Sequence, residues 1–292
     1  MSRMGNSITL DPAAESTVGG GNEFEIRELR ALMDDIFEMH GLDFRNYSYS
    51  SLRRRVLNRV DQENAGTIAG LHQRAQGDAA CMERLLTALT IHVTSMFRDP
   101  GFYLALRGKV LPVLRTYPYL RLWIAGCSTG EEIYSLAVLL HEEDLYSRCR
   151  IYATDLSETV LEKARAGVFP LSQMQEYTRN YQKAGGRRDF SEYYTADDGL
   201  ALFRPFLREN VVFALHNLVS DASFNEFHAI LCRNVLIYFD RSLQGRVHNL
   251  FHDSLVMFGY LGLGRSESVR FTSHEKHYDA VFPVERIFRK IG

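Results

Sequence analysis

The sequence predicts an α/β protein built on a doubly wound, largely parallel sheet, with a small all-helical domain before it. Three observations predict this architecture. Apolar residues recur at helical spacing over residues 23–90, and short apolar runs alternate with helical segments after about residue 120. A polar, tyrosine-rich segment interrupts this alternation over residues 169–208. The 292 residues suffice for about two domains, so each part can have its own core.

Charge and cysteine content exclude several classes of protein. The 34 basic and 36 acidic side chains give a net charge of -2, which argues against a strongly basic nucleic-acid-binding protein. The four cysteines form no closely spaced pair, so we expect neither a disulfide framework nor a metal site. No apolar stretch approaches the roughly 18–20 residues of a membrane span, and no apolar signal region begins the chain. We therefore expect a cytoplasmic protein without membrane insertion, and we expect a monomer because nothing indicates oligomerisation.

The N-terminal part divides into a tail and a helical domain. Residues 1–22 show no periodicity and end in glycines, so we expect a disordered tail. The apolar spacing from Glu23 onward predicts a helix that ends at Gly41. Further helices are predicted around residues 52–60, 68–74 and 78–90. We assign residues 23–91 to an all-helical domain and residues 92–292 to the α/β domain.

The α/β part contains five apolar runs that predict strands, at residues 121–127, 150–155, 211–217, 227–236 and 259–264. Helical segments follow the first two runs. The last stretch, residues 278–291, predicts a closing hairpin. An Asp-Asp-Gly turn at residues 197–199 predicts an antiparallel β-subdomain inserted at about residues 172–210, with a long loop as the alternative.

A glycine-containing turn, AGCSTGEE at residues 125–132, lies between the first strand and its helix, where doubly wound folds bind nucleotides. It is neither GxGxxG nor a Walker loop, and its acidic pair would repel a pyrophosphate. These features favour an adenosine without phosphates and disfavour an NAD-dependent dehydrogenase. Thr129 and Glu132 have the spacing of a capping box. A purely structural tight turn is the alternative.

Other polar residues follow neighbouring strands. Asp155 ends the second strand, where a carboxylate commonly accepts hydrogen bonds from ribose hydroxyls, although it could equally favour the start of the next helix. The carboxyl ends of parallel strands face the ligand crevice, so side chains after the third and fourth strands should point there. These side chains are Asn217, Leu218, Arg233, Asn234 and Tyr238.

Five segments, taken in order, carry a resemblance: IHVTSMFRDP, RLWIAGCSTGEEIYSLA, IYATDLSETVLEKARAGVF, FHAILCRNVLIYFD and GYLGLGRSES. Together they resemble the chemoreceptor glutamate methyltransferase (CheR) family from Glu23 to the end of the chain. The resemblance implies a class I methyltransferase fold and S-adenosylmethionine (SAM) as the cofactor, with S-adenosylhomocysteine as its product and no metal. It implies methylation of glutamates on the cytoplasmic signalling helices of methyl-accepting chemoreceptors.

The resemblance also implies roles for particular residues. The implied catalytic pair is Arg98 and Tyr238. The implied cofactor contacts are His92, Thr94, Arg98, Glu131, Asp155, Asn217, Leu218, Arg233 and Asn234. Two departures stand out: His92 occupies the place of the family's usual asparagine, and Arg265 that of its usual histidine.

Four arginines near the start of the second helix, Arg53, Arg54, Arg55 and Arg59, are predicted receptor contacts, because the methylated helices carry clustered carboxylates. A solvated helix face is the alternative. Two other functions stay open: a methyltransferase for another substrate, and a cofactor-binding adaptor of a chemosensory array without activity. In some family members the inserted hairpin grips a receptor C-terminal peptide, which the sequence leaves undecided here. His248 and His252 lie one helical turn apart and are interpreted as surface or packing residues.

Overall fold

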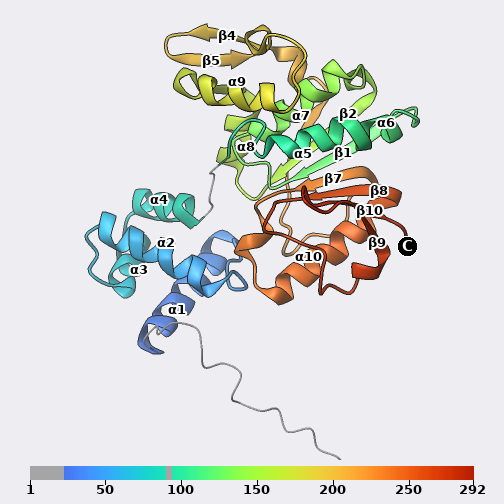
Figure 1. Cartoon of the computed structure of the whole chain (residues 1–292). Coiled ribbons are helices and arrows are strands. Elements are labelled where there is room, and N and C mark those ends of the chain that lie inside the picture. Colours follow the sequence, from blue (N-terminus) through green and yellow to red (C-terminus); the bar gives the residue numbers. More distant parts are fainter. Residues whose placement is uncertain (1–22, 90–93) are drawn as a thin grey trace, which may run out of the picture.

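The computed structural model describes residues 23–89 and 94–292, which form a helical part and a larger α/β part (Figure 1). The helical part contains α1 (Glu23–His40), α2 (Tyr49–Gln62), α3 (Ile68–Gly77) and α4 (Ala79–Leu89). Their apolar faces meet in one core that includes Leu32, Ile36 and Leu85. Gly41 ends α1 with a φ of 68°, a conformation that glycine adopts without strain. The predicted helices are confirmed.

A seven-stranded sheet with the order β6-β2-β1-β7-β8-β10-β9 forms the centre of the α/β part. The first five strands in that order run parallel, and β10 pairs antiparallel with both β8 and β9. The bounds are β1 (Leu120–Ala125), β2 (Cys149–Asp155), β6 (Val211–Leu215), β7 (Phe227–Cys232), β8 (Leu255–Leu263), β9 (Tyr278–Phe282) and β10 (Ile287–Lys290). The predicted parallel sheet and closing hairpin are confirmed. The strand order reverses between β1 and β7, so their carboxyl ends flank the crevice.

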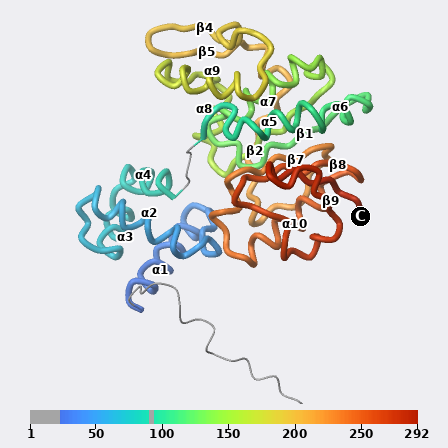
Figure 2. The backbone as a smooth tube through the Cα atoms, viewed as in Figure 1, coloured from blue at the N-terminus to red at the C-terminus, as the bar shows by residue number. Residues whose placement is uncertain are grey.

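Helices cover both faces of this sheet (Figure 2). Side chains of β1 alternate between two cores: Leu122 and Ile124 face one, and Trp123 faces the other. The first core also contains residues of α5 (Pro100–Ala105), η2 (Leu106–Val110), α6 (Leu111–Leu114), α7 (Glu131–Glu142) and α8 (Glu158–Ala166). The second core is closed by α10 (Arg241–Ser254). This burial on both faces explains why the strands are near-continuous apolar runs.

The interruption in the βα alternation is a three-stranded antiparallel sheet, ordered β3-β5-β4, that lies at one end of the molecule (Figure 1). Its strands are β3 (Val168–Pro170), β4 (Tyr194–Asp197) and β5 (Leu200–Phe203). The predicted hairpin is therefore confirmed, with Asp198 and Gly199 at positive φ in its turn. The segment also contains α9 (Met174–Lys183), which the sequence analysis did not predict.

Short 3-10 helices complete the structure and connect these elements. They are η3 (Tyr146–Arg148), η4 (Leu171–Gln173), η5 (Phe190–Tyr193), η6 (Pro205–Arg208), η7 (Leu236–Tyr238) and η8 (Glu275–His277). Among the helices of the described residues, none combines the length and the apolar character that crossing a membrane requires.

A buried carboxylate, Glu142 at the end of α7, attaches the small sheet and α9 to the α/β part. Its Oε1 accepts hydrogen bonds from the hydroxyls of Tyr181 and Tyr193 and from the backbone N–H of Arg187. Its Oε2 pairs with Arg107 at 2.6 Å. Although burial alone would raise the pKa of Glu142, these hydrogen bonds and the Arg107 charge lower it, so the carboxylate stays ionised.

We predict that Glu142→Gln destabilises the fold by about 2–3 kcal/mol, because the amide removes the charge facing Arg107 and turns a donor toward buried groups. The measurement is the free energy of unfolding in urea. Glu162→Gln, on the exposed face of α8, is the matched control and should change stability by less than about 0.5 kcal/mol. Equal unfolding midpoints for the two variants would contradict this role of Glu142.

Candidate active site

The turn after β1 is hydrogen-bonded to the end of β2 and packs tightly against the segment that follows β7. The backbone N–H groups of Gly126 and Cys127 both donate to the carbonyl of Thr154, at 2.9 Å each. Gly126 has a φ of 76°, and a Cβ there would lie 2.6 Å from Cγ2 of Val235. Only glycine satisfies both constraints, so this position brings the backbone close to the crevice.

The start of α7 differs from the predicted capping box. Gly130 is the N-cap and has no side chain to cap with, while the Thr129 hydroxyl donates to Oε2 of Glu131 at 2.6 Å. The capping-box prediction for Thr129 and Glu132 is therefore wrong. Glu131 is buried beneath Tyr177 of α9, and burial raises the pKa of its carboxyl. Of this acidic pair, Glu132 lines the crevice.

Asp155 joins the end of β2 to the turn after β1. Its Oδ2 accepts from the backbone N–H of Ser128 at 2.9 Å, and its Oδ1 accepts from those of Leu156 at 2.8 Å and Ser157 at 3.3 Å. A carboxylate has about four acceptor sites, so capacity remains for a further donor such as a ribose hydroxyl. Asp155 therefore lies where the sequence analysis placed a ribose contact.

Arg233, just after β7, is almost fully buried and lies at the centre of an ion-pair network. Its guanidinium donates to Glu132 and to Asp99, both at 2.8 Å, and to the Arg98 carbonyl at 2.9 Å. It also lies 4.2 Å above the ring of Phe102. Burial alone would lower the pKa of Arg233, but the two carboxylates raise it, so the charge is permanent.

Glu267, after β8, holds the backbone that follows Arg233. Its Oε2 accepts from the N–H groups of Gly264 at 2.6 Å and Asn234 at 3.0 Å, and its Oε1 accepts from that of Ile237 at 3.3 Å. Asn234 has a φ of 61° and lines the crevice, and its buried Oδ1 has no hydrogen-bond partner. This position therefore offers a ligand an unsatisfied acceptor.

These elements line an open cleft at the carboxyl ends of the parallel strands. It is lined by eight residues of the predicted site: Thr94, Arg98, Asp155, Asn217, Leu218, Arg233, Asn234 and Tyr238. Glu131 does not line it, and His92 lies outside the described residues. Arg265 does not line it either, and its guanidinium lies 3.4 Å from a carboxylate oxygen of Asp99 and 3.6 Å from one of Glu285.

Several lining residues were not predicted. Ser128 and Glu132 belong to the glycine-containing turn, so their place in the motif was a usable signal. His216 directly precedes the predicted Asn217. Tyr47 and Leu89 come from the helical part, and no local pattern in the sequence connects them to a site formed by strand ends.

The helical part joins the cleft through an isolated β-bridge between Tyr47 and Phe239. Ser48 N–H donates to the Tyr238 carbonyl at 2.8 Å, and Asp240 N–H donates to the Asn46 carbonyl at 3.0 Å. The backbone of Tyr238 is thereby fixed between the two parts of the chain.

The four arginines of α2 do not share one exposed face. Arg53 pairs with Glu25, and Arg59 pairs with Glu63 at 3.4 Å. Arg55 is buried: it donates to the Leu89 carbonyl, and its guanidinium lies 4.4 Å from the Tyr238 ring centroid. Of the four arginines, Arg54 alone is exposed, so it is the one best placed to meet a partner.

Comparison with known proteins gives two family matches that together span most of the chain. Residues 27–90 match "CheR methyltransferase, all-alpha domain", and residues 92–283 match "CheR methyltransferase, SAM binding domain". The chain belongs to the CheR methyltransferase family.

Individual relatives agree with this assignment. The chain is 48% identical over 263 residues to "Putative methyltransferase Cher3" of Pseudomonas putida, which covers 90% of this chain and 96% of that protein. It is 31% identical to "Chemotaxis protein methyltransferase" of Listeria monocytogenes, over 78% of this chain and 85% of the relative. It is 32% identical to "Chemotaxis protein methyltransferase 1" of Pseudomonas aeruginosa, over 76% of this chain and 82% of that relative.

The cleft of this CheR protein draws on both family domains. Its strand-end residues fall within the match to the SAM-binding domain, whereas Tyr47 and Leu89 fall within the match to the all-alpha domain. The sequence-based resemblance and the SAM-dependent methyltransferase fold are thus confirmed.

We predict that Glu267→Gln weakens binding of S-adenosylhomocysteine about tenfold. The amide keeps only one acceptor oxygen, so at least one buried N–H among those of Gly264, Asn234 and Ile237 loses its acceptor. Leaving such a group unpaired costs roughly 1–3 kcal/mol. We expect the backbone of Asn234 to shift in response, which weakens its contact with the ligand. Isothermal titration calorimetry measures the affinity. Glu226→Gln, an exposed site, is the control. A folded Glu267→Gln protein with unchanged affinity would show that this carboxylate does not position the cleft.

Proposed function

We propose that this chain transfers the methyl group of SAM to glutamate side-chain carboxylates of methyl-accepting chemoreceptors, forming methyl esters for chemosensory adaptation. The observation that carries the proposal is that Arg98 and Tyr238 line the same cleft as Asp155 and Asn234. An anion-binding group and a nucleoside-binding group thus face one space. The relatives named as chemotaxis protein methyltransferases support the same substrate class.

The residues present fit SAM. The unpartnered Oδ1 of Asn234 suits an amino group, and the carboxylate of Asp155 suits ribose hydroxyls. The acidic Glu132 at the glycine-containing turn would repel a pyrophosphate, which favours an adenosine without phosphates. Within this proposal, the residues that hold the cofactor are Thr94, Arg98, Asp155, Asn217, Leu218, Arg233 and Asn234.

The reaction needs no general base from the protein. A glutamate side chain has an ordinary pKa of about 4.3, so at neutral pH its carboxylate is already a nucleophile. Bound SAM supplies an electrophilic methyl group on a sulfonium. One carboxylate oxygen forms a bond to the methyl carbon while the carbon–sulfur bond breaks, and its electron pair stays on sulfur. The chain's contribution is therefore alignment and exclusion of water, which can supply roughly 7–11 kcal/mol.

Arg98 and Tyr238 are the groups we assign to this alignment. A guanidinium can hold a carboxylate through two parallel hydrogen bonds, and the Arg98 backbone is fixed by the bond from Arg233 to its carbonyl. The Tyr238 backbone is fixed by Ser48, and its ring packs on Arg55. Both side chains therefore come from anchored backbone, which favours a defined orientation of the incoming glutamate.

We predict that Arg98→Ala lowers kcat/KM for receptor methylation by roughly 10²-fold, since a positioned charged donor is lost. Tyr238→Phe should lower kcat by about tenfold. The affinity of this variant for S-adenosylhomocysteine should stay within about twofold of that of the unsubstituted chain. The measurements are initial rates with radiolabelled SAM and calorimetric affinity. Full methyl transfer by both variants would disprove these roles.

We predict that Arg54→Glu raises the apparent KM for the receptor about fivefold and leaves cofactor affinity unchanged, because charge reversal on an exposed face repels an acidic partner. Arg27→Glu, exposed on α1, is the matched control and should not change the KM. The assay should be run at low and high salt, because the difference must shrink as salt screens the charges. An unchanged KM would remove α2 from the docking surface.

One experiment separates the proposed function from the alternatives. Receptor-containing membranes are incubated with the protein and methyl-labelled SAM, and the labelled receptor is then treated with alkali. Label released by base supports glutamate methyl esters, because esters hydrolyse there. Base-stable label would instead indicate another acceptor chemistry. Cofactor binding without any transfer, across a panel of receptors, would indicate an adaptor.

A further inference from the structure

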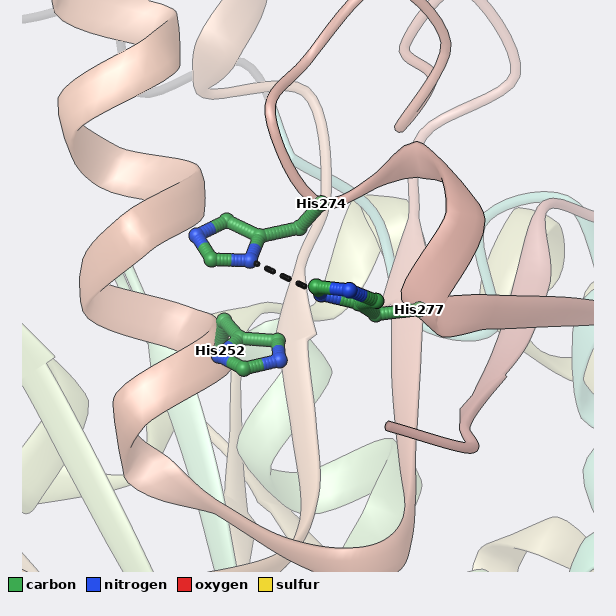
Figure 3. Close-up of side chains that lie close together, drawn as sticks. All are labelled: His252, His274 and His277. Carbon is green, nitrogen blue, oxygen red and sulfur yellow. Dashed lines mark hydrogen bonds between the residues drawn. The ribbon is translucent and has the colours of Figure 1, made fainter.

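Three histidines that come from separate segments gather on the α10 side of the sheet (Figure 3). His252 belongs to α10, His274 precedes η8, and His277 ends η8. One ring nitrogen of each lies within 4.8 Å of the others. None of them lines the methyltransferase cleft. His248, one turn before His252, is buried in α10 and takes no part in the cluster.

Hydrogen bonds fix which ring nitrogens are available. The Nε2 atom of His252 lies 2.8 Å from the Gly292 carbonyl, which can only accept, so Nε2 carries the proton. The Nε2 atom of His274 lies 2.9 Å from Oδ1 of Asn249, which also accepts from the Ser273 hydroxyl. In both neutral rings the Nδ1 lone pair is therefore left for a ligand. Metal-binding histidines characteristically donate their second ring N–H in this way.

The spacing matches two ligands of one ion. Nδ1 of His274 lies 3.5 Å from Nδ1 of His277. Two nitrogens bonded to a tetrahedral ion at about 2.0–2.1 Å are separated by about 3.3–3.4 Å. Nδ1 of His274 has no proton to donate, so its lone pair would repel a lone pair on Nδ1 of His277. Either a proton on the His277 nitrogen or a cation between the two nitrogens removes this repulsion.

The third ring supplies the remaining protein ligand. The His252 ring stacks on His274, with centroids 4.0 Å apart and planes at 14°. Its Nδ1 faces a carboxylate oxygen of Asp253 at 3.5 Å, an arrangement that favours a cation beside it. Binding requires a rotation of the His252 side chain, in which its hydrogen bond to the Gly292 backbone oxygen is exchanged for a bond to the ion.

The charges around the cluster are mixed. Lys290 donates to the carbonyls of His252 and Leu255 and adds a positive charge nearby, whereas Asp253 is the nearby acid. Because an imidazole binds a metal ion only in its neutral form, binding should weaken as the rings become protonated.

We propose that His252, His274 and His277 bind one divalent transition-metal ion of the Zn²⁺ class, with water completing the coordination. Imidazole ligands suit Zn²⁺, Ni²⁺ and Cu²⁺ rather than Mg²⁺ or Ca²⁺. The ion would cross-link α10 to the segment around η8 and stabilise the fold, without taking part in methyl transfer. This proposal departs from our expectation of no metal. The three histidines come from two separate segments of the chain, so their spacing in the sequence did not indicate a shared site.

The test is a calorimetric titration of the untagged full chain, stripped with a chelator, with Zn²⁺ at neutral pH. We expect one ion per chain. His277→Gln, at the exposed member of the cluster, should weaken binding at least tenfold without unfolding the protein. Asn249→Ala should weaken it about tenfold through loss of the His274 partner. His40→Gln, exposed at the end of α1, is the control and should bind as the unsubstituted chain does.

Two further readouts distinguish the site from adventitious binding. Zn²⁺ should raise the melting temperature of the unsubstituted chain but not of His277→Gln, and the increase should disappear as pH falls below about 6.5 and the imidazoles become protonated. Co²⁺ should give the visible absorption of a four-coordinate site. The proposal is overturned if no saturable binding occurs, or if His252→Gln and His277→Gln bind Zn²⁺ like the unsubstituted chain.

Discussion

The buried charge of Arg233 is the constraint on which the cleft depends. Removing a guanidinium from water costs several kcal/mol unless it is fully paired. Here the pairing comes from three places at once: Glu132 in the first turn of α7, Asp99 before α5, and the carbonyl of Arg98. If any of these segments moved, a buried charge would lose a partner. One residue after β7 therefore fixes the walls of the cleft relative to each other.

This rigidity suits chemistry that uses alignment rather than proton transfer. In the proposed reaction a glutamate carboxylate attacks a methyl group and needs no base, so the protein's contribution depends on how firmly the reacting groups are held. The backbone is held even at strained positions: Ser128, Asp99 and Asn234 all have positive φ values around the cleft. These conformations persist because the surrounding hydrogen bonds and packing hold them. At Asn234, for example, Glu267 accepts hydrogen bonds from the N–H groups of Asn234, Ile237 and Gly264.

Periodicity in the sequence was enough to predict the strands of the large sheet, the helices of the N-terminal part, the helices after the first two strands and the hairpin, because burial on one or two faces leaves a repeating pattern. Side-chain direction at the cleft was less predictable. Gly130, the N-cap of α7, has a φ of 101°, and Glu132 rather than Glu131 lines the cleft. No one-dimensional pattern in the sequence records that choice. For Arg55 a signal existed: Leu52 and Val56 lie three residues before it and one after it, on the buried face of α2. The helix α9 was missed because its buried residues, Met174, Tyr177 and Tyr181, lie among polar ones.

The position of Arg55 changes how the two family domains should be understood. One helix, α2, places Arg54 in solvent and Arg55 against the ring of Tyr238. The same arginine donates to the carbonyl of Leu89 at the end of α4. A partner that contacts the exposed face of α2 therefore binds an element whose other face supports a residue of the cleft. Because Ser48 and Asn46 also fix the backbone around Tyr238, the helical domain is a structural part of the candidate active site. It follows that substitutions on the buried face of α2 should be assessed for their effect on methyl transfer itself.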